Sequence, residues 1–158
     1  MSAVVSDTSP LHYLVECEAV GILPVLFQNI IIPPTVHREL QHQRTPLLVR
    51  EWAQSLPSWV TVRAPAVLDH SLNVDEGEKE AICLAREVNA VLLLIDDRKG
   101  RTEAVRYGVR VAGTIGLLEA AAVRGLVDFP ALIQRLRQTN ARLDEDLIQA
   151  ALRRNLSR

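Results

Sequence analysis

Short runs of apolar, often β-branched residues alternate with stretches of helical periodicity along nearly the whole chain. The apolar runs predict strands at residues 3–5, 30–32, 59–62, 91–95 and 109–112. The helical stretches cover residues 10–21, 35–43, 46–56, 75–88, 100–107, 114–124, 130–138 and 144–154. Since strands that are separated by helices of this length form βαβ units, the alternation predicts an α/β protein with a mostly parallel sheet and helices on both of its faces.

Length and composition indicate one ordinary globular domain. The 158 residues contain no linker, internal repeat or low-complexity segment, so we expect a single domain over residues 1–158. Hydrophobic residues make up 48% of the chain, which is enough for a real core. Two cysteines without metal-binding spacing favour the reducing cytoplasm. No apolar run approaches the roughly 18 residues of a membrane span, so we expect no membrane association.

Four acidic residues occupy positions that solvated surface charges do not usually take. Asp7 and Asp96 each follow an apolar run, and the carboxyl ends of parallel strands form the edge at which ligands bind in such sheets. On a helical wheel, Glu78 lies within the arc of the apolar residues of its helix. Glu39 borders the buried side of its short helix, because it follows Val36 by three positions. We therefore expect these four carboxylates to converge on one pocket.

Each of these residues also has a purely structural interpretation. Asp7 can cap the following helix, and Asp96 can stabilise a turn. Glu78 can form a capping box with Asp75 or reach solvent from the edge of the apolar stripe. Glu39 can pair with its neighbour Arg38 in solvent.

Converging carboxylates would repel one another unless a divalent cation neutralised them. Oxygen ligands without a neighbouring His or Cys favour Mg²⁺ or Mn²⁺ over Zn²⁺. A basic stretch that includes Arg98, Lys99 and Arg101 begins beside Asp96, and arginine suits phosphate oxygens. Because the net charge is −1 and aromatic residues are only 4% of the chain, nucleic-acid binding would have to rest on this local charge and on metal. The pattern therefore suggests metal-assisted phosphodiester hydrolysis, and the alternative is a solvated helix face.

Three hydroxyl residues are accessory candidates. Thr8 and Ser9 follow Asp7 directly, and Thr114 follows the last predicted strand within a Gly-Thr-Ile-Gly turn, which places it at the same sheet edge. That turn lacks the glycine spacing and the lysine of known phosphate-binding loops, and a helix N-terminus with Thr114 as its cap explains it adequately. The four histidines have no metal-binding spacing.

Four segments of the chain, taken together and in the order in which they occur, resemble the PIN-domain superfamily. They are DTSPL at residues 7–11, IPPTVHREL at 32–40, GEKEAI at 77–82 and the run 92–101. The resemblance extends to about residue 154, and it is strongest to stand-alone prokaryotic members similar to VapC-type toxin ribonucleases. It implies a three-layer α/β/α sandwich around a parallel sheet of about five strands, and Mg²⁺- or Mn²⁺-dependent cleavage of RNA.

Carried over to this sequence, the acidic positions of the family are Asp7, Glu39, Glu78 and Asp96, the same four that the pattern selects. Two positions depart from the family. Many members have Asp where this chain has Glu78, and many have an acid two positions after the last ligand, where this chain has Arg98. Asp97 is therefore an alternative to Asp96 as metal ligand.

The leading hypothesis is a metal-dependent endoribonuclease that acts as the toxin of a toxin–antitoxin pair. The resemblance also implies a homodimer and a cognate antitoxin, and Leu47, Leu48 and Trp52 suggest an apolar patch on a helix beyond the central sheet. The first alternative is a PIN-like module that binds RNA or protein without efficient cleavage. A second is a small phosphatase or receiver-like domain with Asp7 as phosphoacceptor, although a receiver's acidic pair and downstream lysine are not evident.

Overall fold

The computed structural model describes residues 2–157 of the chain. Its centre is a five-stranded sheet in the order β3-β2-β1-β4-β5, in which every neighbouring pair is parallel. The strands are β1 (Val4–Ser6), β2 (Ile30–Ile32), β3 (Val60–Val62), β4 (Leu92–Leu94) and β5 (Val111–Ala112). The helices are α1 (Thr8–Glu16), α2 (Ile22–Phe27), α3 (Pro34–Leu40), α4 (Leu47–Gln54), α5 (Glu76–Glu87), α6 (Arg98–Arg106), α7 (Thr114–Val123), α8 (Phe129–Arg137) and α9 (Glu145–Leu156).

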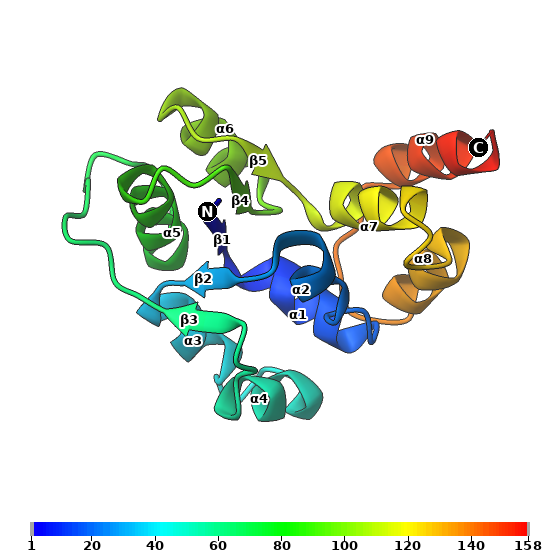
Figure 1. The fold of residues 1–158 in the computed structure, drawn as a ribbon, viewed down its shortest axis with the longest axis horizontal. Coiled ribbons are helices and arrows are strands. Elements are labelled where there is room, and N and C mark those ends of the chain that lie inside the picture. Colours follow the sequence, from blue (N-terminus) through cyan, green and yellow to red (C-terminus); the bar gives the residue numbers. More distant parts are fainter. Residues whose placement is uncertain (1, 158) are drawn as a thin grey trace.

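The sheet separates two apolar cores, because successive strand side chains point to opposite faces. Val4 and Leu94 belong to the core that also contains residues of α1–α4 and α7–α9. Val5 and Leu93 belong to the core beneath α5 and α6. Figure 1 shows α5 apart from α1 and α2, with α7, α8 and α9 gathered at the far end of the molecule. These three layers confirm the α/β/α sandwich that the sequence predicts.

The order in which strands are added to the sheet changes side between β1 and β4. From β1 the chain goes to β2 and β3 on one side, and it returns through α5 to β4 and β5 on the other. Ser6 pairs with Leu94 in the register, and the amide of Asp7 donates to the carbonyl of Leu94 at 2.8 Å. The two central strands therefore end at the same level, at the point where α/β sheets usually bind ligands.

The predicted elements are all present, with boundaries that differ by a few residues, and one further helix, α2, forms between α1 and β2. Two of the three residues that suggested an apolar patch on α4 lie at the surface. Leu47 and Leu48 are 58% and 51% exposed, whereas Val49 and Ala53 are buried. Trp52 is half-buried and packs near Trp59, with 6.2 Å between ring centroids. The helix carries more apolar residues than one face can bury, so Leu47 and Leu48 remain exposed while Val49 and Ala53 pack inward.

Within residues 2–157, no helix combines the length and the apolar character that crossing a membrane requires.

Candidate active site

Asp7 lies at the junction of β1 and α1, and it is only 6% exposed. It occupies the N-cap position of α1, yet its side chain makes no capping hydrogen bond. Burial raises the pKa of Asp7 well above its usual range, the Thr8 amide opposes this shift, and the negative charges of Glu78, Asp75 and Glu39 add to it. The carboxyl of Asp7 is therefore buried without capping the helix that it precedes.

Glu39 projects from α3 towards the start of α1. The hydroxyl of Thr8 donates to Oε2 of Glu39 at 2.5 Å. Burial raises the pKa of Glu39, and the negative charges of Asp75 and Glu80 contribute in the same direction, while the Thr8 hydrogen bond and Arg38 lower it. No ion pair within 4 Å joins Glu39 to Arg38 among the described residues, so the structure does not contain the solvated pair that was the alternative.

Glu78 has two roles in the structure. Its amide donates to Oδ1 of Asp75 at 2.8 Å, and its Oε1 accepts from the amide of Asp75 at 3.2 Å, which is a complete capping box at the start of α5. Yet Glu78 is only 7% exposed. Burial raises its pKa to about 7, and the charges of Asp75 and Asp97 act in the same direction. The structural interpretation is thus correct, but a capping box does not require a buried glutamate.

Asp96 follows β4 and joins it to the start of α7. Its Oδ1 accepts from the amide of Thr114, and its Oδ2 accepts from the Thr114 hydroxyl, both at 2.7 Å. Burial raises the pKa of Asp96, against the lowering effect of these two hydrogen bonds and of Arg101. Asp97 is different, because it is exposed and its Oδ2 caps α6 by accepting from the Gly100 amide at 2.9 Å.

Three glycines make room for the carboxylates. A Cβ on Gly77 would lie 2.5 Å from Oε1 of Glu39, and one on Gly100 would lie 2.7 Å from Oε2 of Glu78. A Cβ on Gly113 would lie 2.9 Å from Oδ1 of Asp96. Because real Cβ atoms essentially never approach other atoms this closely, larger residues at these positions would displace the carboxylates.

The donor chemistry of this cluster fits a divalent cation. Asp7, Glu39, Glu78 and Asp96 offer only carboxylate oxygens, and none of them forms an ion pair within the described part of the chain. Their geometry does not yet form a metal site, because no group of three or more His, Cys, Asp or Glu in residues 2–157 is placed so that it could hold a metal ion. Hydrogen bonds from Thr8, Asp75 and Thr114 direct three of the four carboxylates towards protein donors instead.

Comparison with known proteins identifies the family. The family model DUF3368, described as a PIN domain, matches residues 3–156, which is almost the entire chain. The chain belongs to the PIN-domain family. The resemblance noted in the sequence is thereby confirmed, and PIN domains are generally nucleases that use divalent metal ions.

A structural relative of this PIN domain is a PilT N-terminus domain protein, SSO1118, from the hyperthermophilic archaeon Sulfolobus solfataricus P2. The identity is 18%, the TM-score is 0.48, and the match covers 90% of this chain and 100% of the other. No curated protein matches the chain. The family assignment therefore rests on the family model.

The predicted basic residues of this PIN domain lie in the first turn of α6. Arg98 and Lys99 are exposed and Arg101 is half-buried. None of the three forms an ion pair with Glu103 or Asp97 among the described residues. Arg98 lies 3.8 Å from Oδ2 of Asp144 with a 92% exposed side chain, and an ion pair this exposed contributes little stability.

Of the accessory candidates in this PIN domain, Thr8 and Thr114 hold Glu39 and Asp96, as described above, and Ser9 is half-buried near Asp96 in a surface hollow. The sequence analysis did not select Glu80, which lies on α5 two residues after Glu78. Its Oε1 accepts from the Thr35 amide at 3.2 Å, and its Oε2 accepts from the Thr35 hydroxyl, so it fastens the start of α3. The only sequence feature that indicated this contact is Thr35, a threonine at the start of the short helix α3.

Proposed function

We propose that this PIN domain is a Mg²⁺- or Mn²⁺-dependent endoribonuclease that hydrolyses RNA phosphodiester bonds. The observation that carries the proposal is the set of buried and half-buried carboxyls at the carboxyl edge of β1 and β4, which have raised pKa values and no cationic partner within 4 Å in the described chain. Asp7 supports it most strongly, since its carboxyl is buried without capping α1. A buried carboxylate is costly unless a cation offsets its charge.

In this proposal Asp7, Glu39, Glu78 and Asp96 hold the cation, with Asp97 as a further ligand. The cation, when bound, supplies polarisation of the attacking water and of the phosphate. Thr8 and Thr114 orient Glu39 and Asp96 through the hydrogen bonds that they donate. Arg98, Lys99 and Arg101 hold the RNA backbone through its phosphates, because all three lie within one helical turn of Asp97.

We further propose that the protein is a VapC-type toxin with a cognate antitoxin, and that it acts in the cytoplasm as a homodimer. Membership of the PIN family supports a nuclease, and the exposed Leu47 and Leu48 on α4 support a partner that covers them. A twofold dimer would be the simplest such assembly.

The test is cleavage of RNA by the purified chain with Mg²⁺ or Mn²⁺ and with a chelator. We expect cleavage that needs the cation, and we expect Asp7→Asn to lower its rate by about 100-fold or more while leaving the fold at least as stable. The matched control is Asp146→Asn, which changes an exposed carboxyl in the first turn of α9. Cleavage by Asp7→Asn at the wild-type rate would disprove the proposed role of the site.

A second function is a PIN-like module that binds RNA or protein without efficient cleavage. It is favoured by one observation, that no three acidic side chains of the described residues are arranged around a metal position. The same assay separates the two functions, since the module would bind RNA but leave it intact at every cation concentration.

A further inference from the structure

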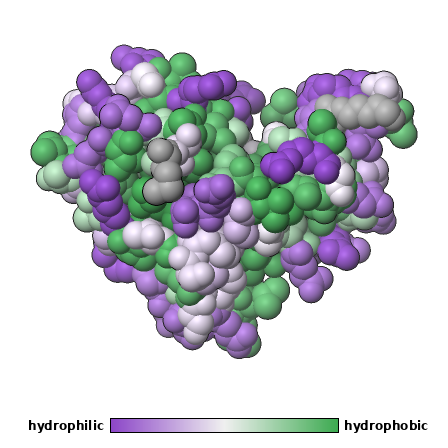
Figure 2. Space-filling view, in the orientation of Figure 1, coloured by the Kyte–Doolittle hydropathy of each residue, from purple (hydrophilic) through white to green (hydrophobic). Residues whose placement is uncertain are grey.

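A cleft passes beside Asp96, between α6, the start of α7 and the segment that leads into α9. It consists of two hollows with volumes of about 620 and 580 Å³. Both are lined by Asp96, Arg101 and Leu147, so they form one continuous surface with the carboxylate where they meet. Figure 2 shows the surface notched between the part of the molecule that carries α6 and the part that carries α9.

The second hollow brings together residues that are far apart in the sequence. Tyr13 comes from α1, Ile115 and Gly116 from the first turn of α7, and Arg142 and Leu143 from the segment before α9. Its volume lies within the range of about 300–1,000 Å³ in which proteins bind small molecules. The lining therefore offers an aromatic ring and aliphatic side chains next to charged groups.

Two guanidinium groups of this hollow are free to bind an anion. Arg154 also lines it, but it donates to Oε2 of Glu119 at 2.8 Å. Arg101 and Arg142 make no side-chain hydrogen bond or ion pair with any described residue. Paired guanidinium donors match the oxygens of a phosphate. The lining also contains Asp96, Asp97, Glu119 and Asp144, so the attraction for a phosphate is local to Arg101 and Arg142.

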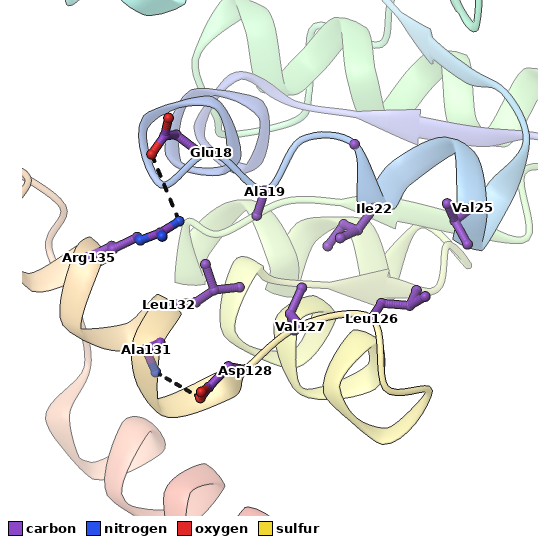
Figure 3. Close-up of a pocket in the computed structure, with 11 residues that line it drawn as sticks. Glu18, Ala19, Ile22, Val25, Leu126, Val127, Asp128, Ala131, Leu132 and Arg135 are labelled. Atoms are coloured by element: carbon purple, nitrogen blue, oxygen red, sulfur yellow. Dashed lines mark hydrogen bonds and ion pairs between the residues drawn. The ribbon is translucent and has the colours of Figure 1, made fainter.

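The apolar hollow in Figure 3 differs from this cleft in the state of its arginine. Its volume is about 410 Å³, and it lies between the turn after α1 and the start of α8. Its arginine, Arg135, is engaged, because it donates to the carbonyl of Cys17 at 3.2 Å and lies 3.9 Å from Glu18. That hollow lacks the free positive charge of the cleft beside Asp96.

Tyr13 and Gly116 shape the space inside the second hollow. Tyr13 is half-buried, and its ring packs edge-on against His12 with 5.4 Å between the ring centroids. Gly116 is exposed, and a Cβ there would have no atom within 4 Å. There is therefore room for a larger side chain where α7 borders the hollow. Aromatic rings of this kind stack on nucleobases without regard to sequence.

We propose that the second hollow is a nucleotide subsite, which holds the base of one nucleotide against Tyr13 and its phosphate with Arg101 and Arg142, adjacent to the phosphodiester at Asp96. The proposal rests on the proposed function only in taking RNA as the ligand. It assigns binding roles to Tyr13 and to the segment before α9, which the catalytic proposal does not use. The nucleotide is single-stranded, because its base must leave a stack to reach the ring.

The test measures binding separately from cleavage. A fluorescently labelled single-stranded RNA of about 12 nucleotides is titrated with the full chain in chelator, at about 50 to 300 mM KCl. We expect Arg142→Ala to weaken binding by about tenfold at low salt and to lower the log–log salt slope by about 0.7, the value for one lost contact to a single strand. Arg124→Ala is the matched control, since Arg124 is exposed at the opposite end of α7.

A steric variant tests the hollow without removing a charge. Gly116→Phe should fill the space and weaken RNA binding by about tenfold, while Gly116→Ala should bind like the wild type. Neither variant should unfold the protein, because the position is exposed, helical and free of close contacts. With RNA that carries one 4-thiouridine, ultraviolet cross-links should fall on peptides that contain Tyr13 or Leu143.

Unchanged affinity and salt slope in Arg142→Ala and unchanged affinity in Gly116→Phe would overturn the subsite, and so would cross-links confined to other peptides. Absence of RNA binding by the wild type would overturn it as well. If the wild type cleaves RNA while these variants bind normally, the subsite alone fails. If RNA binds through the subsite but is not cleaved with Mg²⁺ or Mn²⁺, the catalytic proposal alone fails.

Discussion

Asp7 shows how a single residue can separate a structural from a functional role. An aspartate between a strand and a helix usually caps the helix, and the sequence allowed that interpretation. In the structure Asp7 has the position of a cap without the hydrogen bond, and it is buried beside other acids. Asp96 is the counterpart of Asp7 after β4, and the next residue, Asp97, does cap its helix, α6. Burial without a cap is therefore the feature that distinguishes Asp7.

The raised pKa values of these carboxyls predict how stability depends on pH. A carboxyl whose pKa is higher in the folded than in the unfolded protein binds more protons when folded, so stability increases as the pH falls between the two values. The pKa of Asp7 is well above its usual range and that of Glu78 is about 7. We therefore expect the melting temperature of the chelated protein to rise as the pH is lowered from about 8 to about 5.

Calorimetry in chelator measures this effect, and Asp7→Asn is its control, because the amide cannot titrate and should flatten the profile. Added Mn²⁺ should stabilise the protein most at high pH, since ionised carboxylates bind the cation. If the melting temperature of the chelated wild type fell steadily from pH 8 to pH 5, burial would not raise the pKa values of these carboxyls in the folded protein.

Helix α5 illustrates what sequence can predict about an element. Asp75 and Glu78 stand at the spacing of a capping box, so the start of the helix was predictable from local chemistry alone. The contact between Glu80 and Thr35 was not, because it joins residues 45 positions apart and depends on how α3 packs on α5. Local patterns thus predicted the element but not its neighbour.

The first turn of α5 also gives a test of the glycine positions. Gly77→Ala should change the free energy of unfolding by less than about 1 kcal/mol, because the gain in helix propensity offsets the displacement of Glu39 and its hydrogen bond to Thr8. It should nevertheless lower RNA cleavage by about tenfold or more, since the carboxylate moves.

Chemical denaturation and the cleavage rate check this pair of outcomes. Gly21→Ala is the matched control, because it makes the same change directly before α2, where a Cβ would have no atom within 4 Å. Cleavage at the wild-type rate by Gly77→Ala would mean that the position of Glu39 does not matter for activity.

At the scale of the whole molecule, strand and helix alternation predicted the layers but not the strand order. Placing β1 between β2 and β4 depends on long-range pairing, and that pairing is what brings Asp7 and Asp96 to one edge. The segment before α9 looked like an ordinary connection, yet it places Arg142 in the cleft beside Asp96. Periodicity identifies which residues are buried in an element, whereas such a cleft arises only from the packing of distant elements.

If the buried carboxylates hold a divalent cation, the folded protein should bind Mn²⁺ without any nucleic acid. Electron paramagnetic resonance of free Mn²⁺ during titration reports the affinity without any RNA. We expect the wild type to bind Mn²⁺, Asp7→Asn to lose about tenfold or more in affinity, and Asp146→Asn to bind like the wild type. A wild type that binds no Mn²⁺, or equal affinity in Asp7→Asn, would show that Asp7 and its neighbours do not form a cation site.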